Sequence, residues 1–261
     1  MNVYAPDLLQ HTTVLQEGYM TMKLKKTSEL LWLFGIIFVA LGVAICSKAD
    51  LGVSMIAAPA FVVYEAIAPL WSVFSVGMTE YLIQGLMLIL LCIIVRRFDW
   101  RYLLAFAVAV LYGYALNFFL WLLGPISFDA VWLRYTMLIV GDVITAFGVA
   151  CFFHTYMPLQ VYELFVAEIS ARFSININKV KRAFDLVLLG ISIVLALVLF
   201  GDVGTFDWST IYRSSFHSIG LGTLITTVIN SPIIALMSRL IDKLCEPTAL
   251  FSRLEKLLKR S

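Results

Sequence analysis

Long runs of apolar residues, separated by short polar breaks, make up most of the chain. A helix that crosses a bilayer needs about 20 mostly apolar residues. Six runs reach that length, and they cover residues 29–47, 75–95, 102–123, 133–153, 182–201 and 217–238. We expect each run to form a transmembrane helix, so the pattern predicts an all-α integral membrane protein.

Two further apolar segments are too short to cross a bilayer as ordinary helices. They cover residues 53–69 and 158–171, and both contain proline and glutamate. Such residues are costly on a surface that faces lipid. We therefore expect each segment to be either a re-entrant helix, which returns to the side it came from, or an amphipathic helix at the membrane interface.

One stretch of the chain occurs twice. Residues 35–44 read GIIFVALGVA and residues 141–150 read GDVITAFGVA, so two glycines, two alanines and a valine match without a gap. Each copy runs into a polar segment, which we name the first break (48–52) and the second break (154–158). An internal repeat of this kind indicates a duplicated membrane protein with an interrupted helix in each half.

The positive charges predict the orientation of the two halves. If both short segments return to their starting side, 16 of the 19 lysines and arginines lie on the side of the termini. By the positive-inside rule that side is cytoplasmic, and the halves become inverted-topology repeats. The predicted regions are a cytoplasmic tail (1–28), repeat 1 (29–123), repeat 2 (133–243) and a basic amphipathic helix (246–261).

Composition limits the classes of function. Hydrophobic residues make up 61% of the chain and charged residues 14%, whereas a soluble domain is roughly half apolar and about a quarter charged. No catalytic motif, phosphate loop or metal-ligand spacing is present, so we expect no enzyme, no cofactor and no metal. The expected partners are the lipid bilayer and an unidentified small solute, not nucleic acid; a homodimer is compatible with this pattern.

Four polar residues fall within the predicted spans and are candidates for a solute or ion pathway. Asp185 follows Lys181 by four residues, which places both on one helix face. This pair either lowers the cost of inserting both charges or lines the pathway. Gln84 is the counterpart of Asp185 when the halves are overlaid, and Asp142 has no partner in the repeat. Glu80 lies near the start of its span, where solvent is expected to reach it.

The two breaks supply the other candidates. Lys48 and Asp50 close the first span, and His154 and Tyr156 close the fourth. Unwound backbone and a helix start offer free carbonyl and N–H groups that bind ions, and histidine titrates near neutral pH. Alternatively, these four residues lie in solvated loops and have structural roles only. The sequence leaves both interpretations open.

Several motifs resemble those of the YczE/YitT-like bacterial integral membrane proteins. They are LGVA from Leu41, KADLGVS ending at Ser54, KVKRAFD ending at Asp185, and GLGTL from Gly220, and the likeness covers about residues 30–240. Met55 stands where that family usually has proline. The resemblance implies a protein of the bacterial plasma membrane, and it implies little about activity.

Three functions fit these observations. The first is a secondary transporter or exporter of a small solute that works by alternating access between two inverted halves. The second is a passive channel or facilitator with two re-entrant helices. The third is an accessory membrane protein without transport activity. An open continuous pore would favour the channel, and a sealed, fully packed core with no polar cavity would favour the accessory role. An Asp–Lys pair in the core favours the transporter, because ion-coupled carriers need titratable groups.

Overall fold

The computed structural model describes residues 24–25, 28–201, 212, 215–246 and 248–251. Six long helices span the described chain: α2 (Ser28–Ala49), α4 (Val76–Val95), α5 (Arg101–Leu122), α6 (Val131–Phe153), α8 (Ile177–Phe200) and α9 (Leu221–Leu244). Two short helices, α3 (Ala58–Ile67) and α7 (Val161–Phe173), follow the two breaks. The strands β1 (Leu24–Lys25) and β2 (Cys245–Glu246) form one short parallel pair.

The six long helices confirm the predicted spans, since each is long and apolar enough to cross a membrane. Their outward faces carry large exposed apolar side chains, as a surface in contact with lipid requires; on α4 these include Leu82, Leu86 and Ile93. The chain is therefore a polytopic all-α membrane protein. The boundaries differ most at α9, which was predicted over residues 217–238 and covers Leu221–Leu244. Helix α8 begins five residues earlier than predicted, at Ile177, where the Asn176 side chain accepts a hydrogen bond from the helix start.

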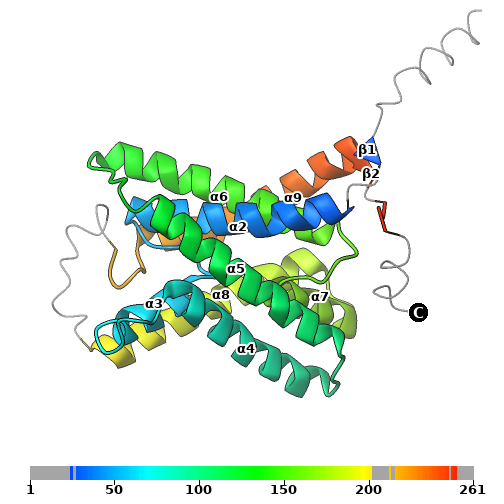
Figure 1. The fold of residues 1–261 in the computed structure, drawn as a ribbon, viewed down its shortest axis with the longest axis horizontal. Coiled ribbons are helices and arrows are strands. Elements are labelled where there is room, and N and C mark those ends of the chain that lie inside the picture. The colour runs from blue at the N-terminus through cyan, green and yellow to red at the C-terminus, as the bar shows by residue number, and fades with distance from the viewer. Residues whose placement is uncertain (1–23, 26–27, 202–211, 213–214, 247, 252–261) are drawn as a thin grey trace, which may run out of the picture.

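The helix termini gather at two ends of the molecule. At the first-break end, Lys48 of α2, Val76 of α4, Leu120 of α5 and Ser218 before α9 line one pocket. At the opposite, second-break end, the start of α5 meets the second break, and the start of α8 meets the C-terminal part of α9. In Figure 1 the first-break end is at the left.

Each of the two segments that contain a short helix leaves the bundle at the same end of the molecule at which it entered. The chain leaves α2 and begins α4 at the first-break end, so α3 lies on a loop that goes into the molecule and comes back. The first half of α3, Ala58–Val62, is buried, and the rest is less so. A ten-residue helix is about 15 Å long, half the thickness of the hydrocarbon core. The re-entrant interpretation is therefore the correct one for α3, and α7 is arranged alike at the second-break end.

The duplicated stretches pack against each other in antiparallel fashion. Gly42 of α2 lies against Gly141 of α6, and Gly148 of α6 lies against Gly35 of α2. Further along, the start of α2 reaches the second break, where the Trp32 indole N–H donates to the carbonyl of Pro158 at 2.9 Å. Small residues permit this close approach of two helix backbones.

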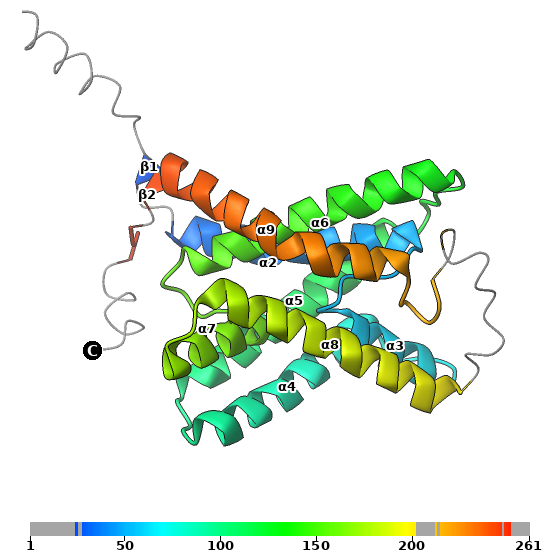
Figure 2. The ribbon, with the colours of Figure 1, turned by 180° about the vertical axis from the view of Figure 1, so that it is seen from behind.

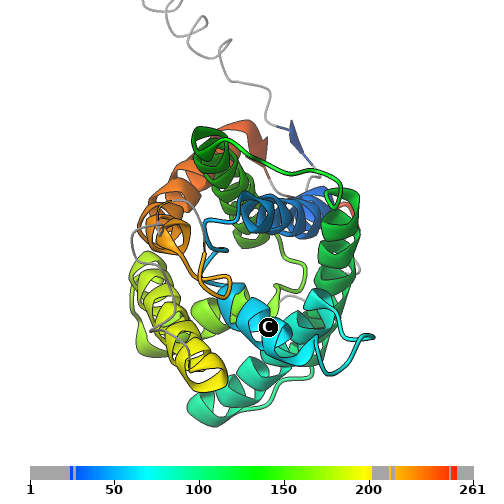
Figure 3. The same ribbon diagram turned by 90° about the vertical axis from the view of Figure 1, so that its left-hand side faces the viewer.

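Helices α5 and α9 flank this pair, and α3, α4, α7 and α8 make up the rest of the bundle. Helix α5 packs on α2 and α4, and α9 packs on α6 and α8. The short helices α3 and α7 each contact both α4 and α8, and Figures 1 and 2 show α3 and α7 at opposite ends of this layer. Seen along the bundle, α4, α5, α8 and α9 lie around the rim (Figure 3).

The two ends of the described chain meet. Strand β1 pairs with β2, with Leu24 opposite Cys245 and Lys25 opposite Glu246. The segment 246–261 was expected to be an amphipathic helix, but its described residues, 246 and 248–251, are not helical. The remainder of that segment, and most of the expected 1–28 tail, lie outside the described residues.

Candidate functional site

A group of ionisable and amide side chains lies buried where four helices face one another. We name it the central cluster, and each member is at most 3% exposed. It consists of Glu80 and Gln84 of α4, Asp142 of α6, Glu163 of α7, and Lys181 and Asp185 of α8. Polar groups at this depth are costly to bury and tend to be functional.

Helical periodicity places these side chains inward. On α8, Lys181, Asp185 and Ser192 are buried, whereas Leu186 and Val187 on the opposite face are exposed by more than half. Residues four apart share a face of a helix, so Lys181 and Asp185 face the interior together. On α4 the same spacing carries Glu80 and Gln84.

Lys181 and Asp185 form the closest charged contact in the cluster. The Lys181 ammonium donates to Asp185 Oδ1 at 2.6 Å, and the two side chains are 4% and 0% exposed. The predicted pairing of these residues is confirmed. Asp142 and Glu163 lie near enough for their charges to interact with both members of the pair. The second oxygen of Asp185 has no hydrogen-bond partner within the described part of the protein.

Glu80 forms the other end of the cluster. Its carboxylate accepts a hydrogen bond from the Tyr162 hydroxyl at 3.1 Å, and its charge interacts with that of Glu163. The expectation that solvent reaches Glu80 is wrong, because α7 packs against α4 and covers this face. Glu80 and Glu163 thus join a site that the sequence indicated only through Gln84, Asp142, Lys181 and Asp185.

The cluster holds more potential negative than positive charge. Among its described residues are four carboxyl groups and one ammonium group. Burying an uncompensated charge costs several kcal/mol, roughly 2.5–3.5 even on the most lenient membrane scales. The surplus carboxyls must therefore be balanced by bound protons or by a cation. No three His, Cys, Asp or Glu side chains in the described chain are grouped so that they could hold a metal ion.

The starts of the two short helices meet beside the cluster. Ser54, before α3, and Gln160, before α7, line the same cavity as Tyr162 and Glu163. Its volume is about 10 Å³, about the least that holds one water molecule. Helix starts carry free N–H groups and the positive end of the helix dipole. The two breaks therefore lead toward one shared, closed centre.

Each break also opens a pocket at its own end of the molecule. The first-break pocket has a volume of about 370 Å³ and is lined by Lys48, Asp50 and Glu65 among others. The second-break pocket measures about 230 Å³ and includes Tyr156 and Glu168. The breaks thus form two separate vestibules whose inner parts approach the same 10 Å³ cavity.

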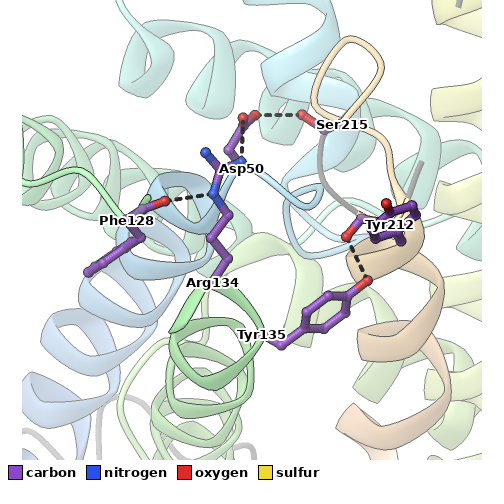
Figure 4. A network of polar contacts seen from close by, with 6 residues as sticks. All are labelled: Asp50, Phe128, Arg134, Tyr135, Tyr212 and Ser215. Atoms are coloured by element: carbon purple, nitrogen blue, oxygen red, sulfur yellow. Dashed lines mark hydrogen bonds and ion pairs between the residues drawn. The ribbon is translucent and has the colours of Figure 1, made fainter. Parts of the chain in front are cut away.

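Lys48 and Asp50 stabilise the first-break end. The Asp50 carboxylate accepts hydrogen bonds from Arg134 at 3.2 Å and from Ser215 at 3.0 Å, which ties α2 to α6 and to the segment before α9 (Figure 4). Lys48 donates to the carbonyl of Gly124 at 3.1 Å. The Asp50 side chain is 56% exposed, so this site is solvated.

His154 and Tyr156 have the corresponding position at the second-break end. The His154 Nε2 atom lies 3.1 Å from Asp242 Oδ1 of α9, and the Tyr156 hydroxyl donates to Glu29 of α2. The four predicted break residues therefore lie at the two ends of the molecule and outside the central cluster, and each joins elements that are distant in sequence.

The first-break pocket also contains Glu65, which was not among the site residues predicted from the sequence. Glu65 of α3 accepts a hydrogen bond from Ser218, and one of its oxygens lies 3.1 Å from His217 Nδ1. The His217 ring stacks on Phe200, with centroids 3.5 Å apart and planes within 5°. Glu65 in an apolar segment was a signal of burial, but its partners are more than 150 residues away, so only the fold reveals them.

Comparison with known proteins gives a family and no further relative. No curated protein and no solved structure matches the chain. One family model matches residues 26–239, and its description is a family of unknown function, DUF6198. The likeness to YczE/YitT-like proteins stays a prediction. Because the match covers all six spans apart from the last residues of α9, the chain belongs to the DUF6198 family.

Proposed function

We propose that this protein is a secondary transporter of a small solute, driven by protons or another cation, rather than an enzyme. One observation carries the proposal: the central cluster buries four carboxyl groups beside a single ammonium group. A carrier that couples solute movement to a cation needs such groups, because they bind the cation in one state and release it in another.

The arrangement of the two halves supports alternating access. The antiparallel packing of the duplicated stretches fits inverted-topology repeats related by a pseudo-two-fold axis. Each half contributes one break and one pocket, and the pockets open at opposite ends. The cavity beside the central cluster has a volume of about 10 Å³. A constricted centre between two larger pockets is the geometry that a carrier requires.

The distribution of basic residues supports an orientation. Arg101 and Arg239 line pockets at the second-break end, and the cluster Arg96, Arg97 and Arg101 precedes α5 there. By the positive-inside rule this end faces the cytoplasm. We place the protein in the bacterial plasma membrane with both termini cytoplasmic, and a homodimer remains compatible with this arrangement.

The rival functions are less well supported. A passive channel needs a continuous polar path, and the cavity found at the centre has a volume of only about 10 Å³. An accessory protein without transport has no need to bury an ion pair and three further carboxyls. Re-entrant helices are shared by channels and carriers, so they do not discriminate between these two functions.

Transport assays in proteoliposomes test the proposal. The purified chain is reconstituted in vesicles that contain a pH-sensitive dye, and a panel of small anions, cations and neutral solutes is added outside with and without a pH gradient. We expect saturable solute uptake coupled to a change of internal pH, above that of protein-free vesicles, which Asp185→Asn abolishes.

Asp129→Asn is the matched control, because it makes the same chemical change at an exposed carboxylate that lines none of the pockets described above. Uptake that Asp185→Asn leaves unchanged contradicts the assignment of the central cluster. Uptake that rises linearly with concentration favours the channel instead.

A further inference from the structure

Lys181, the buried lysine of the central cluster, also lines a third pocket at the second-break end. It lies between α8 and α9 and has a volume of about 390 Å³. Its lining includes Lys181, Arg239, Asn178 and Ser231. We name it the Lys181 pocket. Its volume falls in the range of about 300–1,000 Å³ typical of small-molecule sites.

The polar lining of the Lys181 pocket consists of groups that bind anions. Lys181 lies at its buried side, with 3% of the residue exposed, and Arg239 is exposed. Ser231 is 5% exposed, and its hydroxyl has no hydrogen-bond partner in the described chain. The lining contains no carboxylate. An unpartnered buried hydroxyl beside two cations offers a donor that an incoming anion can satisfy.

Apart from Ser238, the rest of the lining is apolar. Phe153, Ile177, Ile234 and Ala235 complete the wall. Such a wall favours a ligand that carries a short hydrocarbon portion next to its charged group, because burying apolar area is worth roughly 25 cal/mol per Å². An inorganic ion alone would leave this surface uncovered.

We infer that the Lys181 pocket binds a small organic anion, whose carboxylate or phosphate replaces Asp185 as the partner of Lys181. The inference rests on the proposed function and names its class of solute. When the anion pairs with the Lys181 ammonium, the Asp185 carboxylate no longer has a positive partner. It then takes up a proton from solvent and becomes neutral. The site then gains one anion and one proton together, which gives coupling without any net charge in the core.

Two kinds of ligand carry a suitable anionic group. One is a free solute that enters from the second-break end, and the other is the headgroup of an anionic lipid that enters between α8 and α9. The binding test therefore includes both, with soluble short-chain acids in one arm and phosphatidylglycerol in the other.

Thermal unfolding of the purified full chain measures binding, because a ligand of the folded state raises its stability with concentration. The probes are butyrate, butyl phosphate, the neutral butyramide, butylamine and phosphatidylglycerol. We expect the two soluble anions to raise the melting temperature, and the amide and amine to leave it unchanged.

Two variants place the binding at this pocket. Arg239→Gln alters an exposed residue and is expected to fold. The double variant Lys181→Gln with Asp185→Asn removes both charges of the buried pair together and so leaves neither unbalanced. We expect the double variant to weaken butyrate binding about tenfold or more and Arg239→Gln to weaken it about threefold, as lost charge-assisted hydrogen bonds do. The control Arg182→Gln removes an exposed cation of α8 outside the pocket and should leave binding unchanged.

The outcomes separate the inference from the proposed function. Equal stabilisation by butyrate and butyramide, or butyrate binding that both variants retain, overturns the anion site. Stabilisation by phosphatidylglycerol alone, lost in both variants, supports the anion site and assigns it to a lipid headgroup. Proton-coupled uptake of other solutes without anion binding leaves the transporter standing and rejects this inference, whereas anion binding without proton-coupled uptake of any solute does the reverse.

Discussion

Gly42 of α2 and Gly141 of α6 touch through their backbones. A methyl group built on Gly42 would lie 2.5 Å from the Gly141 carbonyl oxygen, and one built on Gly141 would lie 2.8 Å from the Gly42 carbonyl oxygen. The repeat aligns Gly42 with Gly148 and Gly141 with Gly35. A methyl group built on Gly148 would lie 3.1 Å from the Gly35 carbonyl oxygen, whereas one built on Gly35 would meet the Phe152 ring at 3.0 Å. The close approach is therefore reciprocal at Gly42 and Gly141, and longer and one-sided at their counterparts in the repeat.

The glycine contact predicts a strong effect of the smallest substitution. Gly42→Ala forces two helix backbones apart, and overpacking of this kind costs about 1–3 kcal/mol. Gly190→Ala on α8 is the matched control, since no atom lies within 4 Å of the added methyl. Thermal unfolding in detergent should show a lower melting temperature for Gly42→Ala and none of that loss for Gly190→Ala. Equal melting temperatures would contradict the close packing.

The Lys181–Asp185 pair predicts non-additive effects on stability. Lys181→Gln or Asp185→Asn alone leaves one buried charge without its partner, which costs about 3–5 kcal/mol. The double variant removes both charges and should be more stable than either single variant. A double-mutant cycle from denaturant or thermal unfolding measures the coupling. Strict additivity would show that the two side chains do not act as a pair.

The contact between Asp50 and Arg134 predicts that removing the Asp50 charge lowers stability slightly and leaves transport intact. The contact with Arg134 is a partly exposed salt bridge, and such pairs contribute about 0–1 kcal/mol. Asp50→Asn should therefore lower the melting temperature only slightly and leave solute uptake near that of the unmodified protein. A complete loss of uptake in a folded Asp50→Asn variant would return Asp50 to the pathway.

The topology predicts opposite labelling at the two ends of α5. In a background without Cys46, Cys92, Cys151 and Cys245, a cysteine at Arg97 should react with an impermeant thiol reagent only from the cytoplasm. A cysteine at Asp129 should react only from outside. Both positions flank long helices at opposite ends, so each serves as the control for the other. External labelling at position 97 would overturn the orientation of both halves.

Local pattern alone determined the membrane class, the six spans and the duplication. An apolar run of 20 residues has few stable alternatives to a transmembrane helix, and the spacing of Lys181 and Asp185 already placed them together on one face. These features depend on neighbours in the chain, and for that reason they could be derived without a structure.

Tertiary structure decided where the site lies and what the breaks do. Glu80 and Glu163 join the central cluster because α7 folds back against α4, and no local signal distinguishes that from a solvated position. Lys48, Asp50, His154 and Tyr156 had the same polar character, yet each has a partner at least 76 residues away. Burial, and pairing of charges that are distant in sequence, depend on how the helices pack. Only the tertiary structure therefore distinguishes a buried carboxylate from one that forms a salt bridge at the surface.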